Sequence, residues 1–149
     1  LAMGQQGDLE VVDRPLPAFP LRWLASPSRL PADLATVPII TYARQTKPYR
    51  EIRDLALAHG GPTVRLFPSA SLSAAIALIA RGVGVGAFPI SLASDEIGAG
   101  TIVPFAHPWQ PAALTFTAST AAQSANPMAQ IAAELAVATA EKWHATERE

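Results

Sequence analysis

The sequence predicts an α/β fold in which helices alternate with strands of a sheet that contains parallel pairs. Three observations support this prediction. Residues 38–43 (PIITYA) and 83–88 (VGVGAF) have the length and composition of strands. Residues 48–59 and 71–81 carry apolar side chains three and four positions apart, as amphipathic helices do. With 50% hydrophobic and 15% charged residues, the chain can also form a substantial core.

The first part of the chain is expected to be extended. Residues 11–27 contain four prolines, and each removes a backbone donor and disfavours helix in the residue before it. Residues 21–25 (LRWLA) are predicted to form a strand, followed by a connector with room for one helical turn and then by the strand at 38–43.

The helix at residues 48–59 is predicted to begin at Pro48 and to stop at Gly60-Gly61. Its inward face is expected to carry Tyr49, Ile52, Leu55 and Ala56. Residues 63–67 (TVRLF) are then predicted to form a further strand.

The glycines at 82, 84 and 86 resemble a dinucleotide-binding loop, but their context argues against that function. A nucleotide loop joins a strand to a following helix. Here a helix ends at Gly82 and a strand follows, which is the opposite order. We therefore expect Gly84 and Gly86 to allow a neighbouring backbone or a ligand to approach the strand closely.

After a helical stretch at residues 90–98, two more strands are predicted at 101–105 (TIVPF) and 113–120 (ALTFTAST). An alanine-rich helix is predicted from Asn126-Pro127 to about Trp143. Its expected inward residues are Met128, Ile131 and Leu135. The apolar start at Leu1, without an initiator methionine, predicts a fragment of a longer protein.

Composition argues against several classes of function. With a net charge of −1, this segment lacks the excess positive charge that proteins use to bind nucleic acid. The absence of cysteine excludes disulfides and thiol catalysis and fits a cytoplasmic protein. No membrane span or signal peptide is expected. No catalytic, metal or cofactor site is predicted, because the histidines lack ligand-like spacing and no nucleophile motif occurs.

Three connected stretches resemble the effector-binding domain of LysR-type transcriptional regulators. They are residues 38–61 (PIITYARQTKPYREIRDLALAHGG), 64–89 (VRLFPSASLSAAIALIARGVGVGAFP) and 99–105 (AGTIVPF). The order of elements and their spacing carry the resemblance, which covers essentially the whole chain.

The resemblance implies a periplasmic-binding-protein-like domain of type II, with two lobes joined by hinge strands near residues 20–23 and 101–108 and a small effector between the lobes. Residues 1–20 would be the remainder of the first lobe, which is incomplete here. Residues 21–106 would be the second lobe, and residues 107–149 the return to the first lobe and the C-terminal helix.

The same resemblance implies a cytoplasmic regulatory domain that is not an enzyme. It would form dimers or tetramers, with the helix at 48–59 and the strand at 64–67 as candidate dimer surfaces. DNA would be contacted only through an N-terminal domain that is missing from this chain. Effector binding would shift the population of lobe arrangements and thereby the position of that domain.

Candidate ligand contacts follow the strands, where open α/β sheets place their ligands. Arg44 offers a planar fork for a carboxylate, which weakly favours an anionic effector, but it fits a solvated basic face equally well. Lys47, Arg50 and Arg53 are expected to be solvated. The expected ligand-binding residues are Thr41, Arg44, Gln45, Thr46, Ser69, Ser71 and Phe88.

Two alternatives stay open from the residues alone. A periplasmic solute-binding protein of the same fold would have a signal peptide upstream. An enzyme of the same fold would carry its catalytic groups in a missing segment. The effector's identity and the direction of regulation are not specified by the sequence.

Overall fold

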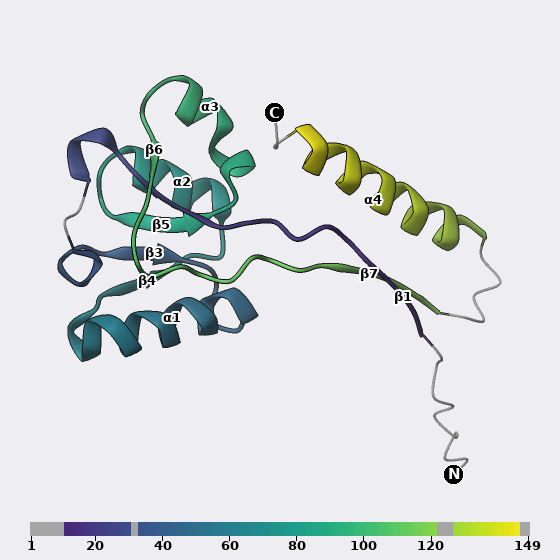
Figure 1. The fold of residues 1–149 in the computed structure, drawn as a ribbon, viewed down its shortest axis with the longest axis horizontal. Helices are drawn as coiled ribbons and strands as arrows, with labels where there is room; N and C mark the ends of the chain where they lie inside the picture. Colours follow the sequence, from purple (N-terminus) through teal and green to yellow (C-terminus); the bar gives the residue numbers. More distant parts are fainter. Residues whose placement is uncertain (1–10, 31–32, 122–126, 147–149) are drawn as a thin grey trace, which may run out of the picture. The chain divides into compact units, whose positions relative to one another are not determined.

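The computed structural model describes residues 11–30, 33–121 and 127–146, with side chains described up to residue 142. The chain divides into two compact units. Unit 2 is the continuous stretch Pro20–Leu114, and unit 1 combines the residues up to Phe19 with those from Thr115 onward. Figure 1 shows the elements of each unit.

Unit 2 contains a five-stranded sheet in the order β4-β3-β5-β2-β6. The central strand β3 is parallel to both β4 and β5, whereas β2 is antiparallel to β5 and β6. The predicted α/β sheet with parallel pairs is therefore confirmed. The strands are β2 (Arg22–Ala25), β3 (Ile39–Thr41), β4 (Leu66–Pro68), β5 (Val85–Phe88) and β6 (Val103–Phe105).

Two main helices accompany this sheet, and β3, β4 and β5 lie between them in Figure 1. In α1 (Lys47–Gly60), the predicted inward residues Tyr49, Ile52 and Ala56 are buried. In α2 (Leu72–Ala80), the buried residues are Ala75, Ile76 and Ile79. The remaining helical segments are η1 (Pro27–Arg29), η2 (Leu34–Thr36), η3 (Gly61–Thr63), η4 (Ile90–Ala93) and α3 (Ser94–Gly98).

The glycine run takes the predicted order of helix, glycine and strand. Gly82 follows α2 with a φ of 70°, a left-handed conformation that favours glycine. A side chain on Gly84 would collide with the carbonyl of Pro38, to which Val85 donates a 2.9 Å hydrogen bond. One on Gly86 would meet Phe88 and the carbonyl of Ile40. The glycines thus allow close packing of neighbouring backbone on β5.

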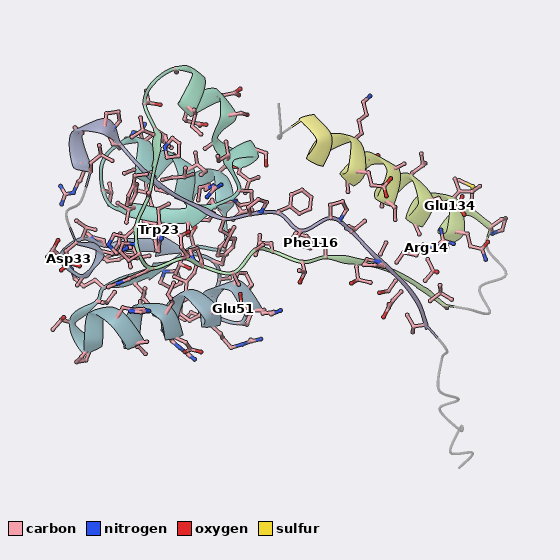
Figure 2. The ribbon with its side chains drawn as sticks, in the orientation of Figure 1. Arg14, Trp23, Asp33, Glu51, Phe116 and Glu134 are labelled. Atoms are coloured by element: carbon pink, nitrogen blue, oxygen red, sulfur yellow. The ribbon has the colours of Figure 1, made fainter. Side chains whose placement is uncertain are left out.

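The described part of unit 1 consists of a two-stranded antiparallel ribbon and one long helix. Strand β1 (Val11–Pro15) pairs with β7 (Thr117–Ala121), and α4 (Pro127–Thr146) contacts both strands. The Arg14 guanidinium lies 3.3 Å from the Glu134 carboxylate, and Figure 2 shows the two side chains together.

The predicted inward face of α4 is wrong in this structure. Met128, Ile131 and Leu135 are 63%, 47% and 61% exposed, whereas Ala133 is buried. The less exposed stripe contains small side chains, Ala129, Ala133, Val137 and Ala140. Small side chains let a helix approach a neighbouring layer closely. The large residues were therefore correctly placed on one stripe but assigned to the wrong side of the helix.

Candidate functional site

The carboxyl ends of β3, β4 and β5 meet at one edge of the unit 2 sheet, because these strands are parallel to β3. We call the residues that follow or end these strands, 41–46, 69–71 and 88, the carboxyl edge. A 2.8 Å hydrogen bond from the Ser69 N–H to the Thr41 carbonyl ties two of these segments together. The arrangement brings polar groups from three places in the sequence to one end of the sheet.

Two buried hydroxyl groups at the carboxyl edge have no hydrogen-bond partner in the described part of the chain. They belong to Thr41, which is fully buried, and to Tyr42, which is 8% exposed. A buried polar group without a partner costs free energy, and this invites an explanation. Burial also raises the pKa of the Tyr42 phenol, so the group stays protonated and can donate.

Tyr42 is a candidate site residue that the sequence prediction did not include. A tyrosine directly after Thr41 was the available signal. Within residues 41–46, which were expected to form the loop after the strand, ligand contacts were assigned to Thr41, Arg44, Gln45 and Thr46 but not to Tyr42. The Tyr42 ring packs on Phe88, with centroids 4.9 Å apart. Phe88 itself is fully buried, so in this arrangement it supports Tyr42 from within the core.

The loop between β3 and α1 ends in a helix cap. The Thr46 hydroxyl accepts a 3.3 Å hydrogen bond from the Tyr49 N–H and donates a 2.7 Å bond to the Ala43 carbonyl. These bonds occupy its proton and one acceptor position. Thr46 therefore has a structural role, and a ligand could use only the remaining acceptor position of its hydroxyl.

Arg44 and Gln45 are exposed in the same loop. Among the described residues Arg44 forms no ion pair, whereas Lys47 lies 3.6 Å from Glu51 and Arg53 lies 2.7 Å from Asp54. Arg50 donates to the Gln45 carbonyl. Within the described part of the chain, neither Arg44 nor Arg50 forms an ion pair, and Arg44 is the one of the two that lies in the loop itself.

Ser69 and Ser71 have different roles before α2. The Ser71 hydroxyl accepts from the Ala74 N–H at 3.2 Å and so caps the helix. The Ser69 hydroxyl donates to the Ser71 carbonyl at 2.8 Å and accepts from the Ser71 N–H. The expectation that one of the two serines caps the helix is correct, and the Ser71 proton remains able to donate to another group.

The described residues contain no group of three or more histidine, cysteine, aspartate or glutamate side chains that could hold a metal ion. Within the same part of the chain, no helix has both the length and the apolar character needed to cross a bilayer. His59 and His107 lie near Trp109, in a different part of unit 2 from the residues of the carboxyl edge.

Comparisons with solved structures identify the fold. The bromide-bound regulatory domain of HypT from Salmonella typhimurium superimposes with a TM-score of 0.66 at 14% identity, covering 81% of this chain and 60% of that domain. The effector domain of the transcriptional regulator AmpR of Pseudomonas aeruginosa gives a TM-score of 0.63 at 19% identity, covering 93% and 69%. The chain thus spans three-fifths of the HypT domain.

The sequence comparisons identify the family. No curated protein sequence matches the chain significantly. The model of the LysR substrate binding domain, however, matches residues 1–140. This match extends over nearly all of the 149 residues and agrees with the fold of the solved regulatory domains. The chain therefore belongs to the LysR substrate-binding-domain family.

Proposed function

We propose that this chain is the effector-sensing part of a LysR-type transcriptional regulator and that it acts by binding a small molecule, not by catalysis. The observation that carries this proposal is the family match over residues 1–140. The matched structures support it, because they are described as a regulatory domain and as the effector domain of a transcriptional regulator. Such regulators act on DNA, which fits a cytoplasmic protein.

The effector is proposed to bind at the carboxyl edge of unit 2, which would be the second lobe. Two helices begin at this edge, capped by Thr46 and Ser71, and helix N-termini favour negative charge. The exposed Arg44 guanidinium adds a planar donor for a carboxylate. The unpartnered hydroxyls of Thr41 and Tyr42 would gain a partner when the effector binds. An anionic effector that carries hydrogen-bond acceptors matches these groups.

The response is proposed to be a population shift in an oligomer. An effector that binds one arrangement of the domain better than another changes their proportions, and a DNA-binding domain elsewhere in the protein would respond. For self-association, β4 is an edge strand whose Phe67 is 51% exposed, and Leu57 is exposed on α1. An open edge strand can pair with a second copy of the chain.

The binding site is tested by a pair of neighbouring substitutions. A thermal-shift screen of small carboxylates, from acetate to benzoate and phthalate, with the matching amides as neutral controls, would provide a ligand. Calorimetry with that ligand should show that Arg44→Ala weakens binding by about 1.5–3 kcal/mol, because a charge-assisted hydrogen bond is lost. Lys47→Ala should change binding little, because Lys47 already pairs with Glu51. Equal effects of the two substitutions would refute the assignment of Arg44.

The buried hydroxyls allow a second test. Tyr42→Phe and Thr41→Val keep the packing volume but remove the hydroxyl, so without ligand they should leave the free energy of unfolding unchanged or raise it. With ligand, the stabilisation should be about 1 kcal/mol smaller than in the unsubstituted chain. A loss of about 1 kcal/mol without ligand would instead indicate structural hydrogen bonds and would remove both residues from the site.

A further inference from the structure

Two histidines flank the buried Trp109 in unit 2. The His59 ring, in the last turn of α1, is stacked on the indole with centroids 5.7 Å apart. The His107 ring meets the same indole edge-on at 5.2 Å and an interplanar angle of 89°. His59 lies at the opposite end of α1 from Thr46, so this cluster is separate from the carboxyl edge.

A hydrogen bond links the fold of this cluster to the protonation state of His107. The Trp109 N–H donates to His107 Nδ1 at 3.2 Å. A neutral imidazole can accept at Nδ1, but the imidazolium carries a proton on both nitrogens and is a donor only. Protonation of His107 therefore removes this bond, because the Nδ1–H of the imidazolium and the Trp109 N–H are both donors and point at each other.

The same turn is tied into the core of unit 2. The Trp109 carbonyl accepts a hydrogen bond from the indole N–H of Trp23, a buried residue of β2 labelled in Figure 2. The Gln110 side chain closes the turn by donating to the His107 carbonyl. Five residues after Trp109, at Leu114, unit 2 ends and the chain continues into unit 1. The turn thus fastens the outgoing segment, residues 106–114, to the sheet.

Among the described residues, the titratable groups that act on the His107 ring are Asp33, beside η2, and His59 on α1. Burial, with the help of His59, lowers the pKa of His107, and Asp33 opposes this effect. Because the folded-state pKa lies below the unfolded value of about 6.5, the unfolded chain binds more protons in the intervening range. The stability that this turn contributes is therefore complete above about pH 6.5 and decreases as the pH falls below it.

We propose that the turn from His107 to Trp109 is a proton-sensitive latch. With His107 neutral, the latch holds residues 106–114 on unit 2. With His107 protonated, the bond from the Trp109 N–H is lost and the outgoing segment loosens. The domain would then respond to acidification through a site distinct from the carboxyl edge, and this response does not require an effector.

Nuclear magnetic resonance on the ¹⁵N-labelled chain tests the latch directly. Between about pH 8 and about pH 5, the His107 ring signal reports its protonation, while the Trp109 amide reports the bond. Protection of that amide against hydrogen exchange should fall about fivefold as His107 protonates, since a hydrogen bond contributes about 1 kcal/mol. The Trp23 indole N–H signal should shift over the same range.

The matched variant is His107→Asn, because the Asn side-chain oxygen can accept from the N–H two residues on but does not titrate. In this variant, Trp109 amide protection should stay constant with pH. His144→Asn is the control variant and should leave the pH response unchanged. His59→Asn should keep the response but move it to higher pH, because His59 helps to lower the pKa of His107. The proposal is overturned if His107 protonates without a change at Trp109, if it stays neutral to about pH 5, or if His107→Asn keeps the full response.

Discussion

Unit 2 buries a core of large apolar side chains, whereas the described part of unit 1 leaves most of its large apolar side chains on the surface. In unit 2, fully buried residues such as Leu24, Ile39 and Ile79 come from both strands and helices. In the described part of unit 1, Ala133 is the buried hydrophobic residue, while large side chains such as Ile131 and Leu135 are exposed. The difference shows that an apolar stripe in the sequence identifies a surface that could be covered, not one that is covered.

The largest expected effect compares one substitution in the two units. Ile79→Ala in α2 removes a fully buried side chain and should lower the free energy of unfolding by about 2–5 kcal/mol. Ile131→Ala in α4 removes a 47% exposed side chain from the same kind of element and should change it by no more than about 0.5 kcal/mol. Urea unfolding followed by circular dichroism measures both. Comparable losses would mean that α4 has a covered face in solution.

A glycine substitution tests the close packing of unit 2. Gly84→Ala places a methyl group against the Pro38 carbonyl and should cost about 1–3 kcal/mol. Gly98→Ala is the control, because a side chain there meets nothing within 4 Å and alanine favours helix by up to about 1 kcal/mol. Thermal unfolding of the two variants in the same buffer distinguishes them. A stable Gly84→Ala variant would show that β3 and β5 can separate at no cost.

A smaller effect is expected at the start of α1. Thr46→Ala removes the side-chain cap on the Tyr49 N–H and should destabilise the protein by about 1 kcal/mol. Thr139→Ala in α4 is the matched change at an exposed helical position. There, alanine should raise the free energy of unfolding by roughly a few tenths of a kcal/mol, because alanine has the higher helix propensity. Denaturant midpoints give both values. A neutral Thr46→Ala would indicate that water replaces the cap.

The smallest effect is expected for surface ion pairs. Removing one should lower the free energy of unfolding by a similar amount in either unit. Arg14 and Arg53 are partly exposed and pair with exposed carboxylates. Arg14→Ala and Arg53→Ala should each cost about 0.2–1 kcal/mol, and the cost should shrink in about 1 M salt. Unfolding at low and high salt provides the check. A larger, salt-independent loss for Arg14 would show that its aliphatic stem, not its charge, holds α4 on the ribbon.

The sequence was informative wherever local signals and packing agreed. Pro48 and Gly60-Gly61 bounded α1, and the glycine run gave the order of α2 and β5. For α4, periodicity grouped Met128, Ile131 and Leu135 but could not choose the covered face, because that choice depends on which other elements pack there. Tertiary packing therefore determines which face of α4 is covered.

The candidate site was predictable to a similar degree. The residues after the strands could be placed at one edge of the sheet because parallel strands end together. Only the hydrogen bonds in the structure show that Ser71 caps α2 and that Ser69 bonds to the Ser71 backbone instead. Tyr42 was missed because strand propensity describes its backbone and gives no information on whether its hydroxyl finds a partner.

The ribbon of unit 1 also sets the order in which the chain can fold during synthesis. Its hydrogen bond from the Ser119 hydroxyl to the Asp13 carboxylate spans 106 positions, and β1 cannot pair until β7 has been made. Unit 2 is a continuous segment between the two strands, so it can collapse while the ribosome is still adding the rest. Pairing across so long a separation is slow. The complete β1–β7 ribbon therefore cannot form before translation passes Ala121.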